Sequence, residues 1–348
     1  MGFGWEDPED RRGPRPACWS RDPGVDQVKP TGLTGNRAMM PQDNRLEATA
    51  NNTRIVTVWD ERYCTSAAPT NSTRKQAVVV RMALAEGLLE LRTVPFDPER
   101  TWADIAEVHA RVYVQAMRTG TPRDLAERSC FDWSPEQANA VARIWSGHVG
   151  ACRLALTDGM VFHPVSGAHH ADADSGGAYC TFNFLAGAAR AMLDDGLGCV
   201  AVIDLDAHQG NGTYELEGRN AAVALFDIAG QQWTTVHKDS RIEYHVVRNA
   251  EGYRGALEQL PAFLDRVRPG LVQYQAGMDP FEGDHVGGIV GVNEAFLKWR
   301  DAFVVEHVRR RGIPLVVNLA GGYVEGISER LHLNTVRVMA DWKRRLHE

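Results

Sequence analysis

The sequence lacks the long apolar run that a membrane helix needs, and MGFGWEDPEDRRG at its start contains no apolar core of a secretory signal. No block of lysine or arginine stands out and the net charge is −7, so we expect no binding to nucleic acid or to an anionic membrane surface. The six cysteines form no C-x-x-C pair, and Cys152, Cys180 and Cys199 lie among apolar residues. These absences favour a cytoplasmic protein with reduced thiols.

The beginning of the chain also lacks hydrophobic periodicity. Residues 1–53 are rich in Gly, Pro, Asp, Arg and Asn, and we predict a disordered or flexible N-terminal extension there. The chain as a whole is 44% hydrophobic and 24% charged, which is typical of globular proteins. Residues 54–348 are therefore expected to form one catalytic domain.

Strand and helix patterns alternate along this domain. The predicted strands are short and apolar, and lie at 55–59, 199–206, 221–227, 271–277 and 314–320. The predicted helices lie at 74–92, 101–117, 134–156, 253–266, 292–311 and 328–346, and Ser134 with Pro135 makes a favourable start for the third of them. This alternation predicts an α/β fold, a single domain with a central parallel sheet flanked by helices. Sites in such folds form in the loops at the carboxyl ends of strands.

One strand ends in an unusual polar stretch, DLDAHQGNGT, which follows the apolar GCVAVI. Asp204, Asp206 and His208 alternate, so a regular strand would project all three to one side. Two buried carboxylates this close repel each other, and a cation or hydrogen-bond donors must offset the cost. Aspartate with histidine suits zinc or another divalent metal. The alternative is a capped strand-to-helix turn in which the carboxylates accept backbone N–H groups.

Two other strand ends and one loop carry further polar groups. Asp279 follows YQAG, Tyr323 follows the glycine pair of NLAGG, and His169 and His170 are adjacent in GAHHADADSGG. Two aspartates and one histidine make three protein ligands and leave a fourth position for water, as in catalytic zinc sites. Two imidazoles can transfer protons at neutral pH, and a tyrosine hydroxyl can polarise a carbonyl.

Four motifs in this order resemble the zinc-dependent histone deacetylase family, part of the arginase–deacetylase superfamily: GAHHADADSGGAYCTFN, DLDAHQGNGT, AGMDPFEGDHVGG and AGGY. The resemblance covers residues 101–345. The glutamine of HQGNG and the segment EGDHVGG are most similar to the class IV branch and its bacterial relatives. The resemblance implies the arginase–deacetylase fold, with residues 54–348 as the deacetylase catalytic domain.

The resemblance also implies roles for particular residues. It assigns one zinc ion per chain to Asp206, His208 and Asp279, and catalysis to His169, His170 and Tyr323, with His170 as the general base and acid. Around them, Asp204 and Asn211 orient the two histidines. Asp204 is implied to help bind a structural potassium or sodium ion, and Asp227, which stands where many members have Ser, is expected to favour that ion. The residues implied to line the substrate tunnel are Tyr179, Gly177 and Trp233. Glu282 and Asp284 are interpreted as turn or rim residues.

The implied reaction is removal of an acetyl or longer acyl group from a protein lysine, a polyamine or a small-molecule amide. One alternative is a ureohydrolase of the same superfamily, which holds two manganese ions, but Gly277 and Gly210 stand where it needs further carboxylates. Another is a non-catalytic, zinc-dependent acyl-lysine binder. The sequence departs from the family where an early His-Pro segment is replaced by YCTSAAPTNSTRKQ, which leaves the substrate and the oligomeric state open.

Overall fold

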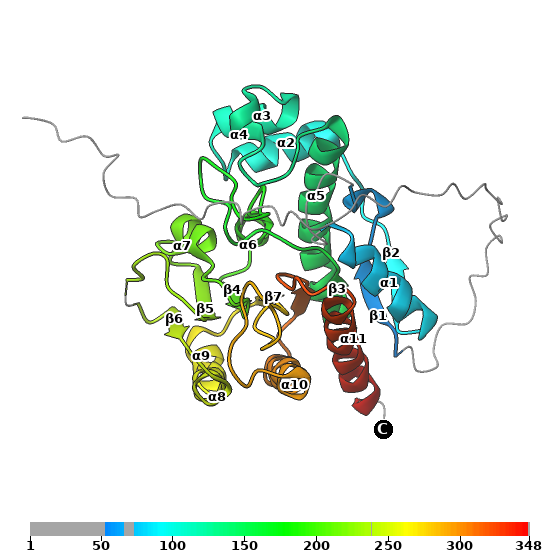
Figure 1. Ribbon diagram of the computed structural model, residues 1–348, viewed down its shortest axis with the longest axis vertical. Coiled ribbons are helices and arrows are strands. Elements are labelled where there is room, and N and C mark those ends of the chain that lie inside the picture. The colour runs from blue at the N-terminus through cyan, green and yellow to red at the C-terminus, as the bar shows by residue number, and fades with distance from the viewer. Residues whose placement is uncertain (1–52, 66–72, 238, 347–348) are drawn as a thin grey trace, which may run out of the picture.

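A parallel β-sheet forms the centre of the molecule in the computed structural model, which describes residues 53–65, 73–237 and 239–346 (Figure 1). In this part of the chain the sheet has eight strands in the order β2-β1-β3-β8-β7-β4-β5-β6, and every pairing is parallel. The predicted single-domain α/β fold with a central parallel sheet is therefore confirmed. The strands are β1 (Ile55–Val58), β2 (Leu89–Arg92), β3 (Met160–His163), β4 (Val200–Asp204), β5 (Val223–Ala229), β6 (Ile242–Val246), β7 (Leu271–Gln275) and β8 (Leu315–Asn318).

Helices cover both faces of the sheet, which is why every residue of its central strands β3, β8, β7 and β4 is buried. Figure 1 shows α5, α6 and α7 on one side and α8 to α11 on the other. The helices are α1 (Lys75–Ala85), α2 (Pro98–Ala106), α3 (Arg111–Thr119), α4 (Arg123–Ala126), α5 (Pro135–Asp158), α6 (Phe184–Asp194), α7 (Asn211–Glu217), α8 (Ala250–Leu257), α9 (Leu260–Val267), α10 (Glu294–Arg310) and α11 (Ile327–Arg345), with a 3-10 turn at Glu61–Tyr63. The predicted start of α5 is confirmed, since the Ser134 side chain accepts a hydrogen bond from the Gln137 backbone.

Three of the predicted helices were wrong in extent. The helix predicted at 74–92 ends at Ala85, and Gly87 takes a φ of 68°, so the chain turns back and joins the sheet as β2. The helix predicted at 101–117 is divided into α2 and α3. The one at 253–266 is divided into α8 and α9 near Pro261, which has no N–H to continue a helix.

In the described part of the chain, five of the labelled helices and strands had no sequence prediction at all, namely β3, β6, α4, α6 and α7. Strands β3 and β6 span four and five residues, MVFH and IEYHV. Among the cysteines, Cys152 and Cys180 are buried with free thiols, as predicted. Cys199 is partly buried and packs against the core, also as a free thiol.

The strand order places the polar strand ends side by side. Strands β8, β7, β4 and β5 are consecutive neighbours and all run in the same direction, so the loops that follow them meet at one edge. Asp204, the last residue of β4, pairs in register with Asp227 on β5. This edge is where a parallel sheet forms its sites.

The predicted N-terminal extension lies outside the described residues, apart from Thr53. Within the described ranges, none of the helices combines the length and the apolar character that crossing a membrane requires.

A shortened chain that begins at Thr53 is expected to keep its fold and activity, because the sheet begins at Ile55 and residues 1–52 contribute no apolar period to a core. The test compares the melting temperature and turnover of the shortened and full-length proteins. Insoluble or inactive shortened protein would contradict the prediction.

Candidate functional site

Three buried side chains from two neighbouring loops converge at the carboxyl edge of the sheet. Asp206 and His208 follow β4, Asp279 follows β7, and one ligand atom from each lies within 4.8 Å of the other two. The Nδ1 atom of His208 is 3.0 Å from Asp206 Oδ1 and 2.8 Å from Asp279 Oδ2. Burial and the Asp206 carboxylate raise the pKa of Asp279 to about 7. Two carboxylates and an imidazole around one point fit a divalent cation, which would offset this repulsion.

Backbone donors orient the two carboxylates. Gly321 N–H donates to Asp206 Oδ2 at 2.7 Å, and Ala207 N–H donates to Asp279 Oδ1 at 3.0 Å. Each aspartate therefore has one oxygen held by the backbone and the other directed at His208. A Cβ at position 321 would lie 2.3 Å from Asp279 Cγ, and one at position 277 would lie 2.7 Å from Asp206 Cα. Only glycine fits at these two positions because the ligand loops approach so closely.

The tandem histidines lie beside this cluster, with ring centroids 3.9 Å apart. His169 Nδ1 is 2.9 Å from Asp204 Oδ2, and His170 Nδ1 is 2.7 Å from Asn211 Oδ1 at the start of α7. Since an amide oxygen only accepts hydrogen bonds, His170 donates through Nδ1 and its Nε2 carries the lone pair.

The surroundings of the two histidines shift their pKa values in opposite directions. Burial and the imidazoles of His169 and His208 hold the pKa of His170 well below its usual range. Burial also opposes the charged form of His169, but the Asp204 and Asp206 carboxylates prevail and raise its pKa to about 9. The site therefore combines a neutral imidazole with one that favours its charged form.

Tyr323 lies on the glycine loop after β8 and is held there by two buried groups. Its N–H donates to Asp284 Oδ2 at 2.7 Å. The Lys75 ammonium donates to the carbonyls of Ala320 and Gly322 and lies 5.7 Å from the centroid of the Tyr323 ring. Burial lowers the pKa of Lys75 to about 8 against the opposing attraction of Asp279 and Asp206. Asp284 therefore holds the backbone of Tyr323, and Lys75 holds the loop before it and lies close to its ring.

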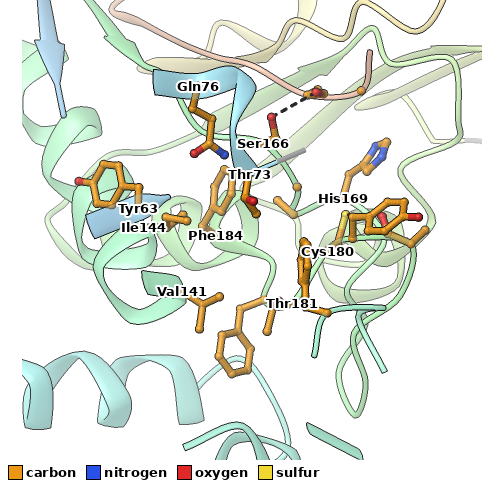
Figure 2. Close-up of a pocket in the computed structure, with 18 of the residues that line it drawn as sticks. Tyr63, Thr73, Gln76, Val141, Ile144, Ser166, His169, Cys180, Thr181 and Phe184 are labelled. Carbon is orange, nitrogen blue, oxygen red and sulfur yellow. Dashed lines mark hydrogen bonds between the residues drawn. The ribbon is translucent and has the colours of Figure 1, made fainter. Parts of the chain in front are cut away.

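A pocket runs from this site into the protein. It is lined by His169, Asp206, Tyr179 and Tyr323, and further along by residues of α1, α5 and the 3-10 turn. Figure 2 shows His169 and Cys180 at one side of the pocket and Tyr63 and Ile144 at the other. The pocket thus places an open space next to Asp206 of the metal-binding cluster, His169 of the histidine pair and Tyr323.

The three residues predicted to line the substrate tunnel lie in different parts of the site. Tyr179 lines the pocket, and its ring centroid is 6.4 Å from that of Tyr323. Trp233 stacks on His170 at 4.6 Å and lies 5.4 Å from the His208 ring. Gly177 exchanges backbone hydrogen bonds with Cys180, which closes the turn that carries Tyr179.

Asp204 and Asp227 form a second acidic pair behind the histidines. Asp204 Oδ1 accepts from the Asp206 backbone at 3.2 Å, and Asp227 Oδ2 accepts from Gly210 N–H at 2.9 Å. Within the described part of the chain, the buried Asp227 Oδ1 has no hydrogen-bond partner. Burial and the Asp204 carboxylate raise the pKa of Asp227 well above its usual range. A cation between the two carboxylates fits this arrangement.

The family profile described as "Histone deacetylase domain" matches residues 68–339. The chain belongs to this family. Histone deacetylase 2 of Arabidopsis thaliana is 26% identical over 282 residues, which cover 76% of this chain and 70% of that protein. The acetylpolyamine amidohydrolase of Mycoplana ramosa is 38% identical over 216 residues, 56% of this chain and 57% of that protein.

The fold of this family member is also found in solved structures. The crystal structure of an acetylpolyamine aminohydrolase from Burkholderia pseudomallei superimposes with a TM-score of 0.67 and 18% identity. The superposition covers 83% of this chain and 98% of that one. At this identity the comparison supports the fold and not the substrate.

Sequence reasoning missed Lys75 as a residue of this site, because it lies at the start of a helix with no motif around it. Asp284 was interpreted as a turn or rim residue. It does accept the N–H groups of Val286 and Gly287 as a turn residue would, but it also fixes the Tyr323 backbone. Gln209 was noted only as a class IV feature of HQGNG, and its side-chain oxygen accepts the N–H groups of Trp233 and Thr234.

Asp279→Ala is expected to abolish tight binding of a divalent metal, because it removes one of three converging ligand groups. Elemental analysis of purified protein measures the metal content. Asp284→Asn is the matched control, since it changes a buried carboxylate of the same loop that is not among the three. Stoichiometric metal in Asp279→Ala would disprove the ligand assignment.

Proposed function

We propose that this protein is a zinc-dependent amidohydrolase that removes an acetyl or longer acyl group from a lysine-like amine. The observation that carries the proposal is the joint placement of the metal-binding cluster, the oriented histidine pair and Tyr323 beside one pocket. Membership of the histone deacetylase family and the similarity to acetylpolyamine amidohydrolases support the same reaction class.

In this proposal Asp206, His208 and Asp279 hold the zinc ion. A bound zinc ion supplies Lewis-acid chemistry, lowering the pKa of a water ligand to ~7 and polarising the substrate carbonyl. Asp–His–Asp ligation is compatible with such a catalytic site, because it leaves coordination positions for water and substrate.

The histidines and the tyrosine move the protons. His170 accepts the proton of the attacking water at Nε2, since Asn211 holds its Nδ1 proton. The attack forms a C–O bond, and Tyr323 donates a hydrogen bond to the oxygen that becomes negative. The C–N bond then breaks as His170 returns the proton to the departing amine, which leaves a carboxylic acid and a free amine.

The ureohydrolase alternative receives little support from the geometry. A second metal needs carboxylates at positions 277 and 210, and both are glycines. A Cβ at 210 would lie 2.7 Å from Asp204 Oδ2, so a larger side chain there would displace the residue that orients His169. The acyl-lysine binder is less favoured because the hydrogen-bonded His170–Asn211 pair is needed for proton transfer and not for binding.

The experiment that tests the proposal is an activity screen on purified protein, with and without added zinc. Its substrates are an acetyl-lysine peptide, a long-chain acyl-lysine peptide, an acetylated polyamine and a small aromatic acetamide, with Asp279→Ala as the inactive control. We expect zinc-dependent release of the free amine from at least one substrate. No turnover on any of them, by zinc-loaded wild-type protein, contradicts the proposal.

The Asp204–Asp227 pair is proposed to bind potassium or sodium. A cation there would neutralise two buried carboxylates, so potassium added at constant ionic strength, with choline as the replacement, is expected to raise the melting temperature. Asp227→Asn removes one charge and is expected to abolish this potassium-dependent rise. An equal rise in wild-type and variant would contradict the site.

Tyr323→Phe should leave the zinc content unchanged, since Tyr323 is not among the three metal-binding residues. It removes one donor to the developing oxyanion, and such a loss costs about 10²–10³ in kcat. Kinetics, elemental analysis and the melting temperature are measured together on wild-type and variant. If the hydroxyl served only to stabilise the fold, the melting temperature would fall while kcat stayed near wild type, and that outcome would remove Tyr323 from the mechanism.

A further inference from the structure

Arg300 on α10 is a fully buried cation outside the set of residues described so far. Its guanidinium contacts Asp301 Oδ1 through Nε at 2.9 Å and Nη2 at 2.8 Å. Asp301 also accepts the hydroxyl of Tyr274 on β7 and that of Thr335 on α11, each at 2.6 Å. Arg300 is thereby fixed between two helices and the sheet.

The same guanidinium bridges two backbone carbonyls. Its Nη1 donates to Leu205 O at 3.1 Å and to Gly277 O at 2.6 Å. Both residues lie just beyond the last residues of β4 and β7, Asp204 and Gln275, where ladder hydrogen bonding ends. Buried carbonyls at such positions need another donor, because leaving one unpaired costs free energy. Arg300 provides a donor for both strand ends, and Leu205 O also accepts a longer bond from the Tyr253 hydroxyl at 3.4 Å.

These carbonyls belong to the peptides that lead into the metal-binding aspartates. The Leu205 carbonyl lies in the same rigid peptide plane as the nitrogen of Asp206, so fixing one fixes the direction of the other. The Gly277 carbonyl shares a plane with the nitrogen of Met278, which precedes Asp279 and itself donates to Gly321 O at 3.0 Å. A hydrogen-bond donor to each carbonyl therefore restricts the backbone positions of Asp206 and Asp279, from which the two ligand side chains project.

The bridge also determines the spacing of the two loops. Asp206 and Asp279 come from different strands, so their separation depends on what connects the loops rather than on local sequence. Both carbonyl oxygens contact one Nη1 atom, so they lie close together and repel each other without it. Replacing the guanidinium with an apolar group leaves the buried Gly277 oxygen without its donor, beside a Leu205 oxygen that keeps only the 3.4 Å bond from the Tyr253 hydroxyl, and the loops must separate or draw in water.

We propose that Arg300 is a positioning residue for the metal centre. It holds the peptides before Asp206 and Asp279 at the separation at which the three ligand groups converge. The inference rests on the metal site of the proposed function and adds to it a residue that contacts neither the metal ligands' side chains nor the pocket. Arg300 is therefore expected to control metal affinity, and not only the stability of the fold.

The test uses Arg300→Met, which retains an unbranched side chain and removes every donor. The dissociation constant for zinc is measured on the metal-free, full-length protein by competition with a chromogenic chelator, and the melting temperature of the same metal-free sample is recorded. Loss of a group that orients a ligand typically weakens metal binding about 10–100-fold, and we expect the Kd to rise by that factor. Arg300→Lys retains the positive charge and one hydrogen-bonding group. We expect its Kd for zinc to lie between those of wild type and Arg300→Met.

Thr335→Val is the matched control. It removes a hydroxyl bonded to Asp301 in the same buried network at nearly constant volume, but it contacts neither carbonyl. It should lower the melting temperature of the metal-free protein and keep the wild-type Kd for zinc. The inference is overturned if Arg300→Met binds zinc as tightly as wild type, or if Thr335→Val weakens binding to the same extent.

Two further outcomes are decisive. If Arg300→Met does not fold, Arg300→Lys takes its place, and a wild-type Kd in that variant overturns the inference. If wild-type protein itself binds no zinc, the metal site of the proposed function fails and this inference fails with it. If wild type and the Arg300 variants bind zinc with the same Kd, the inference about Arg300 is wrong and the proposed metal site still stands.

Discussion

The repulsion between carboxylates buried at one edge of the sheet is the constraint on which the rest of the site depends. Strands β7, β4 and β5 bring Asp279, Asp206, Asp204 and Asp227 together because neighbouring parallel strands end at the same edge. Water cannot screen these charges, so the protein must supply donors and cations nearby. That requirement accounts for most of the unusual residues around them.

The donors come from the loops that follow β4 and β8 at this edge. Backbone N–H groups of Gly321, Ala207 and Gly210 each bond one carboxylate oxygen, and glycine is needed at 321 because a Cβ would overlap Asp279. The buried side-chain cations Lys75 and Arg300 bond backbone carbonyls of the loops rather than the acids themselves. The negative charge of the ligands is thus kept available for a metal ion, while the loops that hold them are fixed.

The local sequence pattern revealed some strands and helices and hid others. The apolar strands before Asp204 and Asp279 were recognisable, because a buried parallel strand is a short run of Val, Ile and Leu. Strand β2 was hidden in the pattern of a long helix, since only the turn at Gly87 separates it from α1. The division of α8 from α9 was likewise missed, although Pro261 marks it.

The sequence by itself determined which chemical groups meet. The order of the motifs and the direction of parallel strands placed the aspartates and Tyr323 at one edge, and the family resemblance added the histidine pair. Only the tertiary structure decided what supports them. Lys75 donates to Ala320 and Arg300 to Leu205, pairs far apart in the chain whose acceptors are backbone carbonyls. Every residue has such a carbonyl, so no sequence pattern distinguishes the ones that need a donor; that depends on where a strand ends and on what packs beside it.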